Sequence, residues 1–454
     1  MMHADFLFSE FGKNKDRNAL IWKDNIYSYS SIHEKYLVWK KKLSGEYPIS
    51  EGSIVSLEGN FSPNTISILL SLIDMNCIIV PLNYSGKPDK EELINISQPD
   101  FRISVNEEDE VKIYKTEKPD SFKTHSLIEI LHERNHPGLI LFSSGTSGKP
   151  KAAVHDFTKL LNKFKTKRDP FVTMNFLLFD HWGGLNTLFH TLSNGGTVLS
   201  PAVRTPEYIC AQIEKFKVEL LPSSPTFLNL LLISEAYKRF DMSSLKIISY
   251  GTEPMSSSTL SRLNSVFPEV KFRQTYGLIE VGVLRTKSKD DGSLWLKLGG
   301  EGFEIRVADN ILQIRSDSAI LGYLNYPSPF TEDGFFITGD QVETDGDYYR
   351  ILGRVSQQIN VGGEKVFPAE IENVIKEMDN IADAVVYGEK NPITGNIICA
   401  DIVLLKEENK SEVKSRMKKF CRERLQGFKV PTKINIVDNL IISERFKKRT
   451  SPEA

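Results

Sequence analysis

The sequence predicts an α/β protein: a large N-terminal domain of αβ-layered, mostly parallel sheets with a small β unit, then a small α+β C-terminal domain. Through the first two thirds of the 454 residues, short apolar runs alternate with longer segments of helical spacing. This alternation is typical of strands joined by helices that cover a parallel sheet. From about Gly292, short β segments and turns replace the helices. We therefore expect a small, mostly antiparallel unit there.

In the first third, residues 64–75 carry apolar side chains at helical spacing, and 77–82 form a short apolar run typical of a buried strand. We expect another strand at 101–105 and a charged surface excursion over 106–122. The expected strands of the middle third are 197–200, 246–250 and 270–276, and its expected helices are 205–216 and 225–236.

The chain divides after Gly353, which gives expected domains of 1–353 and 354–454. The second has the size of a small domain. Its pattern predicts helices at 368–378 and 411–425 and strands at 384–387, 397–405 and 433–437. Between Lys414 and Arg449 there are twelve Lys or Arg residues. Such a run is usually a solvated face, but it can also meet a phosphorylated cofactor or an acidic protein.

Composition excludes several classes of protein. With 40% apolar and 26% charged residues the chain can build large cores, and its net charge of −2 argues against a nucleic-acid-binding protein. Four scattered cysteines without a C-x-x-C pair favour a reducing compartment over a zinc site or disulfides. The first ten residues show no signal pattern, and no apolar run reaches membrane-spanning length. We expect a cytoplasmic protein without a membrane span.

The stretch 139–155, LILFSSGTSGKPKAAVH, has the composition of a phosphate-binding loop that follows a buried strand. Gly145 and Gly148 let backbone N–H groups approach an anion, hydroxyls add donors, and lysines add charge. An ordinary surface turn is the alternative. The loop is not the P-loop of kinases, because two residues separate its glycines and Pro150 follows Lys149. The expected phosphate-binding residues are Ser143, Ser144, Gly145, Thr146, Ser147, Gly148 and Lys151.

Five further motifs follow the loop in order. Three of them are SYGTEPM at 249–255, YGLIE at 276–280 and TGD at 338–340. The other two are Gly353-Arg354 and GGEKVFPAEIE at 362–372. With the loop, these six motifs resemble those of the adenylate-forming (ANL) superfamily over nearly the whole chain, and the glycine-rich last motif is closest to acyl- and aryl-CoA ligases. Each motif alone is weak, but six in order are specific.

The resemblance implies an AMP-forming acid–thiol ligase. Such an enzyme uses ATP and Mg²⁺ to convert a carboxylic acid into an acyl-adenylate with release of pyrophosphate, and then transfers the acyl group to a thiol, most often that of CoA. Phosphate stabilisation in the first step needs fixed donors and a divalent ion. By resemblance Glu280 is catalytic and binds Mg²⁺, Tyr276 stacks on adenine, and Asp340 binds the ribose. The remaining implied nucleotide-binding residues are Gly251, Thr252, Glu253, Pro254, Thr275, Gly277 and Arg354.

The resemblance also implies a mobile C-terminal lid domain that closes over the adenylate. Its catalytic lysine falls on Lys447, although the neighbouring family glycine is Phe446 here. In YGLIE the usual threonine is Ile279. Gly362 and Gly363 are expected to line the tunnel for the pantetheine arm of CoA or of an acyl carrier protein.

His181, in the stretch 179–184, is expected to gate the entry of the carboxylate, with a histidine satisfied near a helix start as the alternative. Trp182, Ser223, Ser224, Phe227 and Tyr250 are candidates for the acyl-pocket wall. Two other functions stay open. The chain can load a carrier protein or another acceptor instead of CoA, or it can be a non-catalytic nucleotide-binding homologue.

Overall fold

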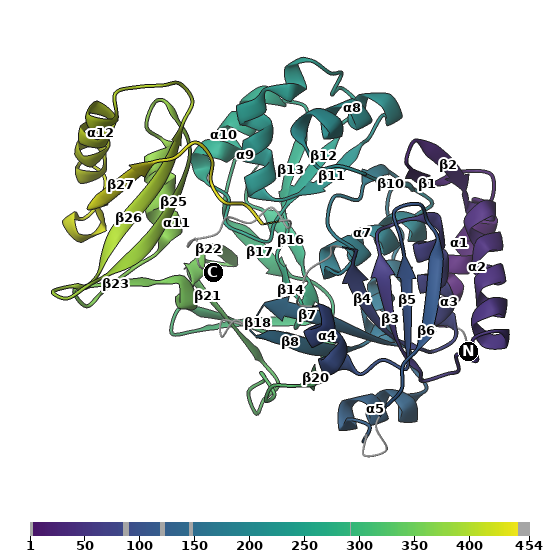
Figure 1. The fold of residues 1–454 in the computed structure, drawn as a ribbon. Coiled ribbons are helices and arrows are strands. Elements are labelled where there is room, and N and C mark those ends of the chain that lie inside the picture. Colours follow the sequence, from purple (N-terminus) through teal and green to yellow (C-terminus); the bar gives the residue numbers. More distant parts are fainter. Residues whose placement is uncertain (1–2, 85–89, 119–122, 145–148, 291, 444–454) are drawn as a thin grey trace.

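The computed structural model describes residues 3–84, 90–118, 123–144, 149–290 and 292–443 (Figure 1). It has mixed α/β architecture, with large N-terminal sheets and a small C-terminal unit that lies to one side of them. The predicted fold class is therefore confirmed.

The first large sheet has seven strands in the order β13-β12-β11-β9-β10-β1-β2, and only the β1–β2 pair is antiparallel. One of its faces packs against α8, α9 and α10 through a core that includes Ile209, Phe227 and Leu263. The carboxyl ends of its parallel strands therefore lie along one edge. The strands are β1 (Asn18–Trp22), β2 (Asn25–Ser28), β9 (Val172–Met174), β10 (Thr197–Ser200), β11 (Leu220–Ser223), β12 (Ile247–Tyr250) and β13 (Lys271–Gln274).

The second large sheet also has seven strands, in the order β20-β8-β7-β4-β3-β5-β6, and only its central pairs are parallel. The predicted surface excursion over 106–122 is wrong for 111–115, which form β6. Val111 and Ile113 pack on the core while charged side chains face outward, as in many edge strands. The strands are β3 (Ile54–Gly59), β4 (Ile78–Asn83), β5 (Phe101–Val105), β6 (Val111–Lys115), β7 (Gly138–Ser144), β8 (Pro150–Asp156) and β20 (Gly322–Tyr323).

Helices α3 and α7 contribute heavily to the largest core cluster, which also includes strands of both large sheets. Every residue of α3 from Thr65 to Ile73 is buried, which explains its nearly all-apolar face. No helix of the described ranges is long and apolar enough to cross a membrane. The helices are α1 (Asp5–Lys13), α2 (Tyr29–Gly45), α3 (Pro63–Asp74), α4 (Lys90–Ser97), α5 (Ser126–Arg134), α6 (Phe157–Asn162), α7 (Trp182–Ser193), α8 (Pro206–Phe216), α9 (Pro225–Ser234) and α10 (Ser257–Val266).

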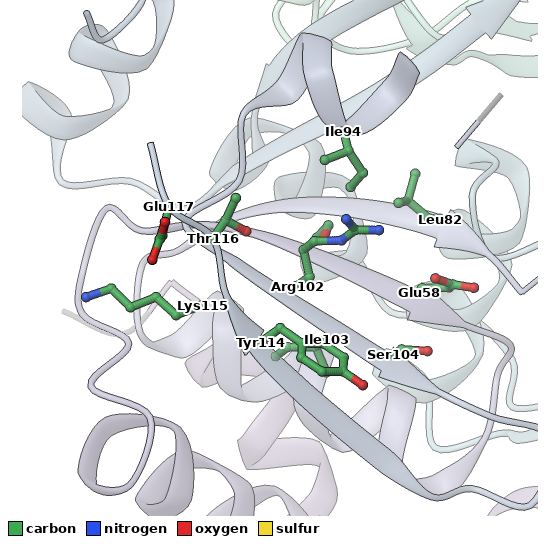
Figure 2. A pocket seen from close by; sticks show the side chains of 11 residues that line it. Glu58, Leu82, Ile94, Arg102, Ile103, Ser104, Tyr114, Lys115, Thr116 and Glu117 are labelled. Carbon is green, nitrogen blue, oxygen red and sulfur yellow. The ribbon is translucent and has the colours of Figure 1, made fainter. Parts of the chain in front are cut away.

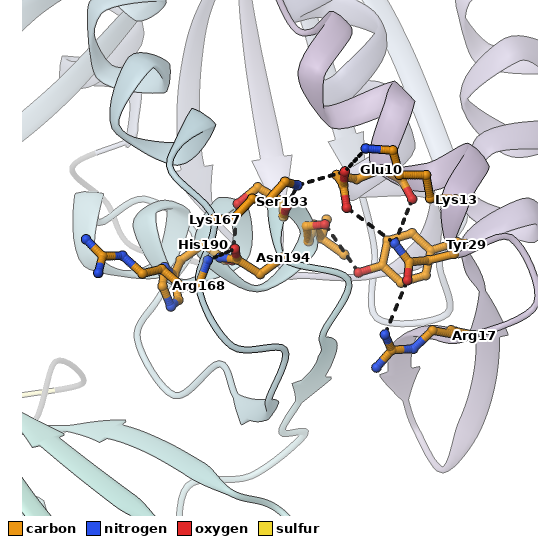
Figure 3. Close-up of polar contacts among 11 residues, drawn as sticks. Glu10, Lys13, Arg17, Tyr29, Lys167, Arg168, His190, Ser193 and Asn194 are labelled. Atoms are coloured by element: carbon orange, nitrogen blue, oxygen red, sulfur yellow. Dashed lines mark hydrogen bonds and ion pairs between the residues drawn. The ribbon is translucent and has the colours of Figure 1, made fainter.

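Polar contacts fix the C-terminal end of α7 to the N-terminal helices (Figure 3). Glu10 on α1 forms ion pairs of 2.8 Å with both Lys13 and Lys167. Lys167 in turn donates to the carbonyl of Ser193, the last residue of α7, at 2.6 Å, and the Tyr29 hydroxyl donates to the carbonyl of Gly196 just beyond it at 2.7 Å. These contacts hold α7 in place, and its other end carries His181.

A small antiparallel sheet follows, in the order β16-β17-β22-β21-β19-β18. It begins at Arg285, before the predicted Gly292, because β16 pairs directly with β17. Its strands are β16 (Arg285–Ser288), β17 (Leu296–Gly299), β18 (Phe303–Ala308), β19 (Ile311–Ser316), β21 (Phe336–Asp345) and β22 (Tyr348–Arg354). The short hairpin β14 (Gly277–Leu278) and β15 (Gly282–Val283) precedes it.

The C-terminal unit has a core of its own, in which α11 and α12 pack on one face of the β25-β26-β27 sheet. Asn229 on α9 donates to the carbonyl of Ala382 at 3.2 Å and so joins this unit to the N-terminal part. The domain boundary after Gly353 stays a prediction. The elements are β23 (Ile359–Val361), β24 (Glu364–Val366), α11 (Pro368–Lys376), β25 (Ile381–Asn391), β26 (Gly395–Leu404), α12 (Lys410–Arg422) and β27 (Lys433–Ile436).

His155 on β8 gives a pH-dependent stability that can be measured. Its side chain is 0% exposed, neither ring nitrogen has a hydrogen-bond partner among the described residues, and burial lowers its pKa to about 3. The unfolded chain, in which the histidine has its ordinary pKa, binds a proton that the folded chain rejects. Stability is therefore lost as the pH falls below that ordinary pKa, by about 2 kcal/mol between neutral pH and pH ~5.

Urea denaturation of wild type and His155→Leu at both pH values tests this expectation. The difference between the two proteins isolates His155 from all other titrating groups. An identical pH dependence in both would show that His155 does not remain neutral in the folded chain.

Candidate functional site

The phosphate-loop candidate is a β-hairpin. Ser143 at the end of β7 lies opposite Lys151 on β8, and Ser144 lies opposite Pro150. Gly145, Thr146, Ser147 and Gly148 lie outside the described residues. Asn325 fixes the base of the hairpin from a distant part of the chain. Its amide accepts from the N–H of Ala152 at 3.0 Å and donates to the carbonyl of Pro150 at 2.8 Å.

Tyr323 connects Glu280 to this hairpin. Its hydroxyl donates to Glu280 Oε1 at 2.6 Å. The Lys151 ammonium lies over the rings of Tyr323 and Tyr326, 5.6 and 5.0 Å from their centroids. Burial, and then the charge of Glu280, raises the pKa of Tyr323, so the phenol stays protonated and can donate. Tyr323 thus contacts a carboxylate through its hydroxyl and a cation through its ring.

Sequence reasoning missed Tyr323, Tyr326 and Asn325. The sequence did contain a signal for them, because the apolar run 320–324 predicts a short strand, and in the structure it contains β20 next to β8. Three aromatic or amide side chains in seven residues beside a predicted loop would have justified a site prediction.

A second cluster joins three of the predicted residues. The Tyr276 hydroxyl donates to Asp340 Oδ2 at 2.5 Å, and Arg354 Nε donates to Asp340 Oδ1 at 3.2 Å. Asp340 on β21 pairs directly with Arg354 on β22, so the sheet register sets this contact. The Tyr276 ring packs in a core cluster with Val281 and other apolar residues.

Burial dominates the electrostatics of the second cluster. Asp340 is only 5% exposed, and burial raises its pKa while Arg354 opposes that shift. The buried carboxylate also raises the pKa of Tyr276, in addition to the larger effect of burial. Asp340 therefore has two fixed donors, and as an acceptor-only group it suits hydroxyl donors of a ligand.

Glu280 fits a magnesium ion bound together with phosphates. Within the described ranges, no group of three His, Cys, Asp or Glu residues could hold a metal ion by itself. Mg²⁺ commonly takes one or two protein carboxylates and completes its oxygen shell with substrate phosphates and water. Glu280 is half-buried and linked through Tyr323 to the phosphate-loop hairpin, which matches that mode of binding.

The segment after β12 is packed against the segment after β13. A Cβ atom on Gly251 would lie 2.7 Å from the backbone carbonyl oxygen of Thr275, so only glycine fits. Thr252 has a positive φ of 74°, and the Glu253 carboxylate accepts from the N–H of Thr226 at 2.8 Å. Pro254 is exposed and lines the cavity between the N-terminal part and the C-terminal unit.

Gly277 is equally confined. A Cβ there would lie 2.8 Å from the carbonyl oxygen of Gly282, in the opposite strand of the hairpin. Ile279, which replaces the usual threonine, packs against apolar core residues.

Several buried side-chain atoms near the carboxyl edge of the first large sheet have no hydrogen-bond partner in the part of the chain that the structure describes. They belong to Asn175 after β9, Ser223 at the end of β11 and Gln274 at the end of β13. Thr226 Oγ1 and the Trp182 indole N–H add to this group. Buried polar atoms are normally paired, and unpaired ones at a strand-end edge are expected where a ligand binds.

His181 forms the N-cap of α7, because its Nδ1 accepts from the N–H of Gly183 at 3.0 Å. This is the alternative that the sequence left open. It leaves Nε2 as the ring atom that can face a substrate. Ser224 likewise caps α9, and Phe227 and Tyr250 are buried in the core beneath the sheet edge.

A cavity of about 430 Å³ separates α9 and the segment after β12 from the C-terminal unit. Gly353, Phe367 and Tyr387 are among its lining residues. Gly362 and Gly363, at the turn between β23 and β24, are exposed and do not line it. Lys447 lies outside the described residues.

A separate cavity of about 570 Å³ lies over β3, β5 and β6 (Figure 2). Glu58, Arg102 and Tyr114 line it together with apolar residues. None of the predicted site residues lines this cavity.

Two family models match this chain. A family model described as AMP-binding enzyme matches residues 8–297, and one described as AMP-binding enzyme C-terminal domain matches residues 370–447. A CoA ligase of Rhodococcus jostii (strain RHA1), named for a bicyclic propanoyl group, is 26% identical over 324 residues. That match covers 66% of this chain and 61% of the relative.

Pyochelin synthase PchD of Pseudomonas aeruginosa (strain UCBPP-PA14) is 30% identical over 268 residues, which cover 54% of this chain and 48% of that protein. The matched part of the chain thus spans about half to three fifths of these two relatives' length. The crystal structure of the anthranilate CoA ligase AuaEII superposes with a TM-score of 0.83 at 18% identity, covering 99% of this chain and 95% of that one. At this identity the superposition shows the shared fold.

Proposed function

Because the chain belongs to the family of AMP-binding enzymes, within the adenylate-forming superfamily, we propose that it activates a carboxylic acid with ATP and transfers the acyl group to a thiol. The observation that carries the proposal is the presence of two side-chain clusters, each held by its own contacts: Glu280–Tyr323–Lys151 and Tyr276–Asp340–Arg354. One suits a metal-bound polyphosphate, and the other suits a ribose.

In the first step, a carboxylate oxygen attacks the α-phosphorus of ATP, and pyrophosphate leaves with the bond electrons. Mg²⁺ bound with the phosphates would neutralise the charge that develops on them. The hairpin at 143–151 would hold the β- and γ-phosphates, Glu280 would bind the ion, and Asp340 would accept from the ribose hydroxyls. Lys447 would approach the α-phosphate from the C-terminal unit.

In the second step, a thiolate attacks the acyl carbon and AMP leaves. CoA is the first candidate acceptor, since several of the relatives are named as CoA ligases or as a CoA synthase. A carrier-protein thiol is the second, since the name of one relative, pyochelin synthase PchD, does not include CoA. The cavity beside Gly353 and Phe367 offers a route for either thiol between the two parts of the chain.

A screen of carboxylic acids for acid-dependent exchange between labelled pyrophosphate and ATP tests the first step. We expect exchange with at least one class of acid, and AMP release with acyl-CoA formation when CoA is added. Exchange that is normal but never consumes CoA would favour the carrier-protein acceptor. Nucleotide binding by calorimetry without exchange for any acid would identify a non-catalytic homologue.

Glu280→Gln will lower the exchange rate at saturating ATP by about a hundredfold, because the amide replaces an anionic ligand of Mg²⁺. The glutamine oxygen can still accept from Tyr323, so folding should be kept. Exchange rates measured over a range of Mg²⁺ concentrations check the prediction.

Tyr323→Phe is the matched control for Glu280→Gln. It removes the hydrogen bond to Glu280 but keeps the carboxylate, so we expect a much smaller loss. An unchanged Mg²⁺ dependence in Glu280→Gln would rule out Glu280 as a metal ligand.

A further inference from the structure

Helix α12 carries a charge pattern that the fold does not require. Six of its residues are cationic and only Glu412 is acidic, a net charge of +5 over 410–422 in a chain whose net charge is −2. Val413, Met417 and Cys421 pack its inner side into the core of the C-terminal unit. The cationic residues therefore lie on the remaining faces.

Four of the cations form one row along the helix at every fourth position. This cationic row consists of Lys410, Lys414, Lys418 and Arg422. Residues four apart are neighbours on a helix surface, so the row places like charges side by side. Lys410 is also the first residue of the helix, where the helix dipole disfavours a cation.

No described acidic residue forms an ion pair with any member of the row. By contrast, Arg416 on the same helix forms a bidentate pair with Glu408, and Lys429 and Lys433 nearby pair with Glu370 and Glu389. Other exposed lysines of the unit, such as Lys390 and Lys406, also lack an ion pair among the described residues, so what distinguishes the row is its spacing of four residues along one helix. A locally unfavourable pattern in an otherwise consistent element is typical of a functional surface.

We propose that the cationic row of α12 docks a protein partner that presents an acidic helix, and that this partner carries the acceptor thiol. Four cations spaced over about 18 Å match carboxylates spaced by helical turns better than the compact phosphates of one cofactor. Glu407 and Glu408 precede the row and Glu423 follows it. A broad anionic surface, such as a membrane or nucleic acid, would meet these carboxylates as well, and repulsion would disfavour it.

The position of α12 supports the assignment of the thiol to this partner. In the C-terminal unit α11 packs against α12, and Ala369, Asn373 and Lys376 of α11 line the cavity between the two parts of the chain. One helix therefore separates the cationic row from the proposed thiol route, a distance of about 8–10 Å between helix axes. Figure 1 shows α12 at the outer edge of this unit, and in the row Lys410 and Arg422 are exposed while Lys414 and Lys418 are half-buried. The assignment of the acceptor thiol to this partner rests on the proposed function, whereas the docking surface itself does not depend on it.

Calorimetric titration of the full chain with a synthetic helical peptide of about sixteen residues, with glutamate at every fourth position, tests the docking surface. We expect binding that weakens as salt is raised. Lys414→Glu/Lys418→Glu should weaken it at least ~10-fold. Lys390→Glu/Lys406→Glu changes the net charge equally at exposed lysines outside the row and should leave binding within about twofold. Lys414→Gln/Lys418→Gln, which introduces no repulsion, should give an intermediate loss if the first variant folds poorly.

Equal weakening by both charge reversals, or none by the row variant, would overturn the docking surface. The docking surface would also be overturned if Lys414→Glu/Lys418→Glu kept peptide binding but lost binding to phosphatidylserine vesicles, to single-stranded RNA or to CoA. Pyrophosphate exchange should be unchanged in the row variant. If wild type shows no exchange with any acid, the proposed function fails while the titration still decides the docking surface.

Discussion

Asp340→Ala will lower acid-dependent pyrophosphate exchange by at least about a hundredfold. The carboxylate is buried, and it is the acceptor for both Tyr276 and Arg354. Its removal takes away the proposed ribose acceptor and also the buried hydrogen bonds from Tyr276 and Arg354, which itself costs roughly 1–3 kcal/mol of folding stability. Exchange rates and thermal unfolding of the purified variant measure the two effects separately.

Tyr276→Phe and Asp340→Asn are the matched controls. The first keeps the carboxylate and the aromatic ring, and we expect it to lose less than about tenfold in exchange. The second keeps the shape and one acceptor oxygen, and we expect an intermediate loss. An alanine variant that unfolds normally and still exchanges at the wild-type rate would exclude Asp340 from the nucleotide site.

Lys447→Ala will slow acyl-adenylate formation by roughly 10²- to 10³-fold, because it removes the cation proposed to stabilise charge on the α-phosphate. The thiol-transfer step, started from a chemically prepared acyl-adenylate, should change little, since the family resemblance implies that the C-terminal domain closes in one arrangement for adenylation and in another for thiol transfer. Single-turnover measurement of the two steps checks this division.

Lys448→Ala is the natural control, because Lys448 carries the same charge one position further along the same basic stretch. We expect it to retain most of the activity. A larger loss in Lys448→Ala would shift the catalytic position by one residue. Equal small losses in both variants would mean that this basic stretch does not take part in adenylation.

Motif residues near strand ends could be predicted from sequence because parallel strands bring their carboxyl ends to one edge. Gly251 follows one of these strand ends, and the close approach of Thr275, which follows the neighbouring strand, leaves no room for a Cβ atom there. The pairing of Asp340 with Arg354 follows from the register of two antiparallel strands, which the sequence pattern did not specify.

Other parts could not be predicted, for identifiable physical reasons. Strand β6 is an edge strand with a charged outer face, so its residues resembled a surface loop. Tyr323 and Asn325 contribute through contacts with residues more than forty positions away, which no local pattern encodes. His181 carries no local signal that separates a helix cap from a substrate contact, and its Nδ1 acts as the cap.

The central claim is that the Glu280–Tyr323–Lys151 cluster and the Tyr276–Asp340–Arg354 cluster form one adenylation site. Exchange of labelled pyrophosphate into ATP, measured for wild type and Asp340→Ala over a broad panel of carboxylic acids, tests it most directly. The account predicts exchange that depends on a particular class of acid and on Mg²⁺, and that is lost in Asp340→Ala. ATP binding to the wild type without exchange for any acid, or exchange that survives unchanged in Asp340→Ala, would contradict it.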